Sequence, residues 1–146
     1  MKPLTPTPEP TPTHPTTMPT RQFAHEKPSV YQQSLHFVAW AGELLERLPK
    51  SLAAHNQLDR APTSILLNIA EGTAKTTAPD RCRYFDTARG SAFECAACLH
   101  VLVMRKALTA GEIENGKGML IAIVSMLIGL VKANDPGRLL EESLSY

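Results

Sequence analysis

The sequence lacks several features that would assign it to a common functional class. The chain has only three cysteines, Cys82, Cys95 and Cys98, and an odd number this small does not make a disulfide framework. No secretory apolar segment opens the chain. We therefore expect a reducing cytoplasm. No apolar run reaches the roughly 18–20 residues that span a bilayer, so no membrane partner is expected.

Strong net charge is also missing. The formal net charge is only +1, which gives no global field that would attract nucleic acid or an anionic membrane. Basic and acidic residues balance after residue 27. A role with nucleic acid would therefore need a local basic patch, or patches that symmetry repeats.

Motifs for metal binding and catalysis are absent as well. Di-iron bundles need Glu-x-x-His on two helices, and this spacing does not occur. Cys95 and Cys98 form a C-x-x-C pair inside a helical pattern, where a redox motif would need a strand-to-helix turn and zinc would need two more ligands. Cys82 lies more than three turns away, and His100 points elsewhere. We expect buried small side chains here, no cofactor, no metal and no enzyme.

Helical patterns are what the sequence does contain, and they predict an all-α, antiparallel up-down-up-down four-helix bundle. Residues 28–137 make up this predicted domain. Residues 1–27 form a Pro/Thr-rich tail with few apolar groups, which we expect to be disordered, either as a docking segment or as a dispensable extension. Residues 138–146 form a short C-terminal tail.

The helix boundaries follow from caps and breakers. The first helix is expected over residues 29–48, with Ser29 as its cap. The second begins between residues 51 and 56 and ends near residue 75, and Pro62 inside it should bend it or mark a local boundary. Pro79 opens the third helix. The segment Thr109–Glu112 fits a capping box and opens the fourth.

The third helix carries the most regular apolar repeat in the chain. Its members alternate three and four residues apart, like a heptad seam, and small residues in the middle allow a close helix approach. They are Phe85, Ala88, Ala92, Cys95, Leu99 and Leu102.

The fourth helix is apolar almost all round between residues 119 and 131. One stripe suffices for the core of a small bundle, and a second stripe exposed to water would be an unusually large patch. We therefore predict homo-oligomerisation through the second stripe. Its residues are Met119, Ile123, Met126 and Leu130.

Polar residues at helical spacing interrupt the second and third helices. Ser64, Asn68 and Glu71 share one face of the second helix, and Arg89 and Glu94 lie on the third. An antiparallel hairpin would place Arg60 near Glu94 and leave Glu71 and Arg89 about 12 Å apart. These residues form either a ligand or catalytic site or a structural polar seam whose hydrogen bonds fix the register. We favour the seam, because no nucleophile joins them.

Basic residues gather around the connection between the second and third helices. In a ring assembly, symmetry would repeat them into a rim that could contact the phosphates of nucleic acid. Glu71, Asp80 and Asp86 lie in the same region, which favours a solvated surface of mixed charge. The candidate nucleic-acid contacts are Lys75, Arg81, Arg83 and Arg89.

Two segments of the chain together resemble a known family. The segment QLDRAPTSILLNIAEG (residues 57–72), followed by RYFDTARGSAFE (residues 83–94), is similar to bacterial four-helix bundle proteins related to the protein encoded in ribosomal RNA intervening sequences. The resemblance covers about residues 31–131. It implies a homopentamer and distant kinship with the accessory protein of diversity-generating retroelements, which binds a reverse transcriptase and nucleic acid. Pro62, the long tail and the near-neutral charge depart from the retroelement protein.

Two hypotheses for function follow. The first is a non-enzymatic, homo-oligomeric scaffold or adaptor, with a pentamer favoured, that binds protein or RNA partners. The alternative is a nucleic-acid-binding accessory factor that works beside a reverse transcriptase and contacts RNA or DNA.

Overall fold

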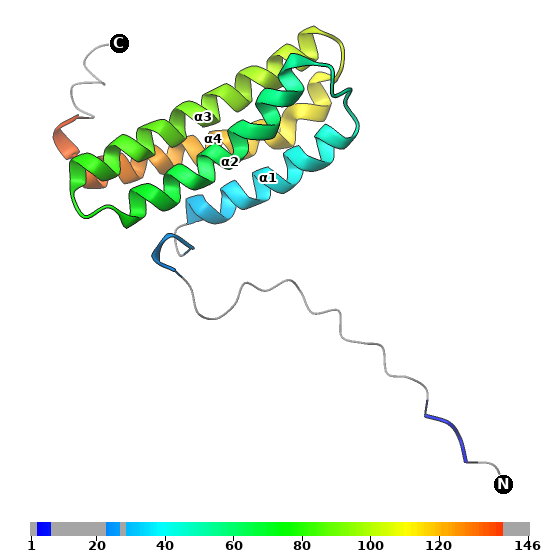
Figure 1. Cartoon of the computed structure of the whole chain (residues 1–146), viewed down its shortest axis with the longest axis horizontal. Helices are drawn as coiled ribbons and strands as arrows, with labels where there is room; N and C mark the ends of the chain where they lie inside the picture. The colour runs from blue at the N-terminus through cyan, green and yellow to red at the C-terminus, as the bar shows by residue number, and fades with distance from the viewer. Residues whose placement is uncertain (1–2, 7–22, 27–28, 139–146) are drawn as a thin grey trace.

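The computed structural model describes residues 3–6, 23–26 and 29–138, and within these ranges four long helices form a bundle (Figure 1). The predicted all-α helical bundle is confirmed. Short connections join α2 to α3 at one end of the bundle, and α1 to α2 and α3 to α4 at the other (Figure 1). The helices are α1 (Ser29–Glu46), α2 (Ala53–Ala74), α3 (Ala78–Met104) and α4 (Ala110–Asn134).

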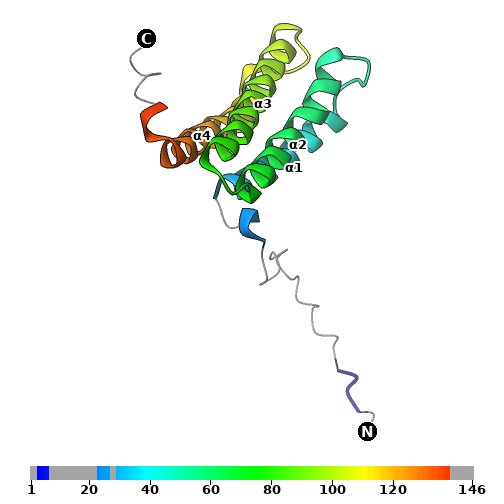
Figure 2. The same cartoon turned by 60° about the vertical axis from the view of Figure 1, so that its left-hand side comes forward.

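Each helix packs against two neighbours: α1 against α2 and α4, and α3 against α2 and α4. Figure 2 shows the pair α3 and α4 beside the pair α1 and α2. The predicted seam of α3 lies entirely in the shared core, from Phe85 to Leu102. On α1 the buried line runs through Ser34 and Ala41, whereas Leu35 and Val38, which are larger, are only half-buried.

The predicted capping signals are present at two helix starts. Thr77 accepts a hydrogen bond from the backbone of Asp80 at 3.4 Å, with Pro79 in the first turn of α3. At α4, Thr109 and Glu112 complete the capping box through bonds of 3.0 and 3.2 Å, and these bonds lower the pKa of the Glu112 carboxyl. Ser29, predicted as a cap, is instead the first helical residue of α1.

Pro62 was predicted either to bend α2 or to mark a local boundary, and the structure excludes the boundary. The helix runs without interruption from Ala53 to Ala74, with Pro62 buried on its core side. Pro62 has no N–H to offer the carbonyl of Leu58, one turn earlier. Core packing of the neighbouring Leu58, Ile65 and Ile69 outweighs the loss of this one bond.

The bundle extends slightly beyond its predicted limits. Residues Ala24–Glu26, assigned to the tail, form a short 3-10 helix η1 that contacts α1 and α2, and Gln32 Nε2 donates to the Glu26 carbonyl at 2.9 Å. At the other end, Arg138 bonds the carboxylate of Asp86 on α3. The predictions for residues 1–2, 7–22, 27–28 and 139–146 lie outside the described part of the chain.

The contact between α1 and α4 is built around Trp40. Its ring stacks on Phe37 at a centroid distance of 5.7 Å and lies against Gly116 of α4. A Cβ atom on Gly116 would stand 2.3 Å from the indole, so only glycine allows this approach. Trp40 therefore packs within its own subunit, as an ordinary position at the edge of the core.

Replacing Gly116 tests this contact. Gly116→Ala should lower the free energy of unfolding by about 1–3 kcal/mol, because the indole must move out of its place. Gly118, two residues later, has open space around it, and Gly118→Ala should raise stability by roughly 0.5–1 kcal/mol through helix propensity. Urea unfolding followed by far-UV circular dichroism measures both. A Gly116→Ala variant as stable as Gly118→Ala would contradict the packing described.

Candidate functional site

The polar residues of α2 and α3 form a partial seam. Ser64 Oγ and Ser91 Oγ lie 2.8 Å apart across the two helices, and Asn68 Nδ2 donates to the Ser64 carbonyl at 2.8 Å and to Ser64 Oγ at 3.2 Å. Ser91, which the predicted seam omitted, is buried. A hydrogen bond between two helices fixes their register along the bundle axis, so the Ser64–Ser91 bond has a structural role.

The other predicted members lie apart from this cluster. Glu71 forms an ion pair with Lys75 of its own helix at 3.8 Å. Glu94 is exposed, and Arg60 and Glu94, both within the described ranges, make no ion pair with each other. Arg89 is half-buried on α3 and takes part in interactions of its own. The structure therefore does not gather these side chains into one ligand site.

The basic residues near the connection of α2 and α3 surround an aromatic ring. Lys75 Nζ lies 5.1 Å and the Arg83 guanidinium 5.4 Å from the centre of the Tyr84 ring. Lys75 also pairs with Glu71, and Arg83 pairs with Asp80 at 3.6 Å. A mixed-charge surface results, in which each of these two cations already has an acidic neighbour.

Arg81, the third candidate phosphate contact, links the start of α3 to the ends of α2 and α4. Its Nε donates to the carbonyl of Lys75 at 2.7 Å, just after α2, and its Nη1 lies 3.5 Å from Asn134 Oδ1 at the end of α4. Two of its five N–H donors are thus engaged inside the subunit. The prediction of Arg81 as a phosphate contact stays a prediction, and these two bonds give the side chain a structural role beside it.

All three cysteines are buried and free, as predicted. Burial raises the pKa of the Cys95 thiol to about 12, and it also raises the pKa of Cys82 and Cys98. These thiols therefore stay protonated at neutral pH, which disfavours nucleophilic or metal-binding chemistry. Among the described residues, no group of three His, Cys, Asp or Glu side chains could hold a metal ion.

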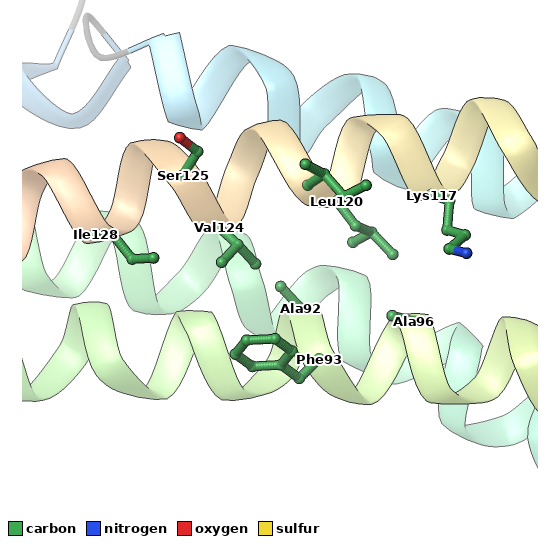
Figure 3. A pocket seen from close by; sticks show the side chains of 9 residues that line it. Ala92, Phe93, Ala96, Lys117, Leu120, Val124, Ser125 and Ile128 are labelled. Carbon is green, nitrogen blue, oxygen red and sulfur yellow. The ribbon is translucent and has the colours of Figure 1, made fainter. Parts of the chain in front are cut away.

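An apolar groove of about 340 Å³ lies between α3 and α4. Figure 3 shows Leu120 and Val124 of α4 directed towards Ala92 and Phe93 of α3, with Lys117 at one end. Carbon atoms line most of it, and no cluster of polar groups converges there. An arrangement of this kind can bind an apolar partner surface, but it offers nothing that would activate a substrate.

Three large apolar side chains on this groove are open to solvent. Phe93 is 57% exposed, Ile121 is 65% exposed and Ile128 is 37% exposed. Ile121 and Ile128 stand seven residues apart, so both lie on one face of α4. The heptad spacing of isoleucines was visible in the sequence and would have found this face.

The residues of α4 that were predicted to form the oligomer interface mostly pack inside their own subunit. Ile123 is fully buried in the core, so its assignment to an interface between copies is wrong. Met119, Met126 and Leu130 are partly buried and pack against the same core. The exposed apolar surface of α4 instead lies on its third side, around Ile121 and Ile128.

By length and composition alone, α4 is apolar enough to cross a membrane, and it is the one such helix among the described residues. In the bundle, its residues Leu120, Ile123 and Leu127 are buried against neighbouring helices. The core helix of a soluble bundle can have the same apolar composition, so this composition is weak evidence for a membrane span.

The fold and groove define a small all-α bundle protein with an apolar groove between α3 and α4. The family model of the 23S rRNA-intervening sequence protein matches residues 26–129, and the chain belongs to this family. A crystal structure of a protein of unknown function from the S23 ribosomal protein family of Bacteroides thetaiotaomicron VPI-5482 is similar, with 25% identity and a TM-score of 0.66. The similarity covers 70% of this chain and 98% of that one. The comparison with curated proteins found no match.

The serine pair offers a test of the structural role of the seam. Ser64→Ala should lower the free energy of unfolding by about 1–2 kcal/mol, because the buried Ser91 hydroxyl loses its partner. The double variant Ser64→Ala/Ser91→Ala should lose less than the sum of the two single variants. Thr63→Ala, at an exposed position of the same helix, serves as the control. Strict additivity in chemical denaturation would show that the two hydroxyls do not interact.

Proposed function

We propose that the chain is a non-enzymatic, homo-oligomeric helical-bundle scaffold whose copies meet at the groove between α3 and α4. The exposure of Phe93, Ile121 and Ile128 on this groove is the observation that carries the proposal. Full burial of such a side chain is worth roughly 1.5–3 kcal/mol, so three of them give a strong incentive to associate. Contiguous apolar surface of this kind marks interaction sites in soluble proteins.

A second copy is the occupant that fits the groove best. The groove runs along two helices and has aliphatic and aromatic banks, which suits the apolar face of another helix. The chain itself supplies such a helix in α4. A pentamer, which the family resemblance implies, would be a closed ring in which this groove meets a different patch on the next copy.

The structural contacts of the polar side chains agree with a scaffold role. Ser64, Ser91 and Asn68 bond one another, Arg81 joins helix ends, and Cys95 is held as a neutral thiol. These polar and thiol groups are engaged in structural contacts or buried in the core. The remaining surface of the assembly would then hold protein or RNA partners, which is the adaptor function.

Nucleic-acid binding, in a ribosomal or reverse-transcriptase context, is the second candidate. The arrangement of Lys75 and Arg83 around Tyr84 favours it, because an aromatic ring between two cations suits stacked bases and phosphates. The family name refers to an intervening sequence of 23S rRNA. We place this function second, since Glu71 and Asp80 offset the two charges.

The assembly is tested by a pair of equally exposed positions. Ile121→Lys should weaken self-association by tenfold or more, on the order of the loss of one buried isoleucine. Leu67→Lys, at a 61% exposed site on α2 outside the groove, should leave it unchanged. Sedimentation equilibrium from about 1 to 100 µM measures both, with circular dichroism to verify folding. A wild-type chain that remains monomeric throughout would refute the proposal.

RNA binding is tested by charge removal at the two ends of the bundle. Lys75→Gln/Arg83→Gln should weaken binding to a structured RNA several-fold and lower its salt dependence by about two counterions. Arg105→Gln/Lys106→Gln removes the same charge after α3, at the other end of the bundle, and should have little effect. Gel-shift titrations at two salt concentrations give both quantities. An equal effect of the two variants would exclude a specific contact at Tyr84.

A further inference from the structure

We propose that the groove between α3 and α4 binds a single-chain anionic amphiphile, a medium-chain fatty carboxylate, with the carboxylate at Lys117 and the alkyl chain directed towards Ile128. Binding of this ligand is an inference of its own. Only its consequence for self-association rests on the proposed function.

Lys117 gives the groove one charged end. Its side chain is half-buried and extends from α4 towards α3 at the end of the groove (Figure 3). Among the described residues, no carboxylate forms an ion pair with Lys117, whereas Lys75 and Arg83 each pair with an acidic neighbour. None of the described residues that line the groove is acidic. The ammonium group of Lys117 is therefore available to an anion from outside the subunit.

The rest of the groove suits an alkyl chain. Ala92 and Ala96 have short side chains on the α3 side, which leaves the groove open beside Val124 of α4 (Figure 3). The hydroxyl of Ser125, the other polar side chain of the lining, points away from α3 in the same view. A ligand with polar groups along its length would lose their hydration here without gaining partners. An alkyl chain with one anionic end avoids this loss.

The length of the groove sets the length of the chain. Lys117 and Ile128 lie at its two ends, and their separation on α4 corresponds to roughly 16 Å along the helix axis. An extended alkyl chain of about 12 to 14 carbons covers this distance. The groove, with a volume of about 340 Å³, is also within the size range of small-molecule sites.

Burial of methylene groups supplies most of the affinity. A fully buried methylene strengthens binding roughly fourfold, and about twofold per methylene is expected in a groove that leaves one side of the chain exposed. The affinity should therefore rise with chain length up to about 12 to 14 carbons. It should level off for longer chains, whose ends extend beyond Ile128.

An occupied groove changes the proposed assembly. The alkyl chain would contact Phe93, Ile121 and Ile128, which are the side chains proposed to meet a second copy. The ligand and the second copy therefore exclude each other. Because the ligand binds only the free groove, it shifts the equilibrium towards separate subunits.

Isothermal titration calorimetry of the full chain, with probes below their micelle concentrations, tests the binding. Decanoate should bind about fourfold more weakly than dodecanoate. Dodecyltrimethylammonium, with the same chain length and the opposite charge, should bind about tenfold more weakly or worse. Equal affinity for the two dodecyl probes, or no detectable binding of dodecanoate, would overturn the proposal.

Charge reversal at one lysine tests the position of the carboxylate. Lys117→Glu should reverse the preference, so that dodecyltrimethylammonium binds more tightly than dodecanoate. Lys132→Glu makes the same change at an exposed lysine of α4 outside the groove and should keep the wild-type preference. Ala96→Leu, which fills the groove, should weaken both probes about tenfold, with circular dichroism to verify folding. Wild-type preference in Lys117→Glu, or wild-type affinity in Ala96→Leu, would place the ligand elsewhere and overturn the proposal.

Sedimentation equilibrium tests the consequence for assembly. Dodecanoate at about ten times its dissociation constant should weaken self-association about tenfold, and dodecyltrimethylammonium at the same concentration should not. Unchanged or tightened association with dodecanoate would overturn the competition. Monomers under all conditions would sink the proposed assembly, while calorimetry would still decide whether the groove binds the fatty carboxylate.

Discussion

The close approach of α2 and α3 is the constraint on which the rest of the bundle depends. Only residues 75–77 join the two helices, so they must lie side by side from their first contact. Gly72 makes this possible, because a Cβ atom there would stand 2.8 Å from the ring of Phe85. Further along, the hydroxyls of Ser64 and Ser91 meet at 2.8 Å, which holds the spacing and the register together.

This arrangement gives α3 two unlike flanks. The flank facing α2 carries Phe85 against Gly72 and the buried Ser91, whose hydroxyl bonds Ser64 across the two helices. The flank facing α4 carries Phe93 and Ala96, and with Ile121 and Ile128 it borders the open groove. The polar side chains of Ser64 and Ser91 are thus used between the two helices, whereas the surface on the other side of α3 is apolar. Under the proposed function, burial of this apolar area would drive binding.

Much of the fold followed from local rules in the sequence. The cap at Thr109 and the apolar repeat of α3 predicted their elements well, because each signal acts within one helix. Predictions that needed the packing of several helices failed more often. Ser34 was missed in the core, since it hides its polarity by donating to the Val30 carbonyl at 2.7 Å. On α4, helical periodicity showed several apolar sides, but only the packing of α1 and α3 around it decides that Ile123 is inside and Ile121 outside.

The contact of Trp40 with Gly116 has an optical consequence. The chain has a single tryptophan, so its ultraviolet emission arises at one place, where α1 meets α4. Separation of these two helices would wet the indole and move its emission to longer wavelengths. The apolar groove involves other residues of α4, centred on Ile121 and Ile128, so the emission of Trp40 reports the integrity of the bundle rather than the state of the groove.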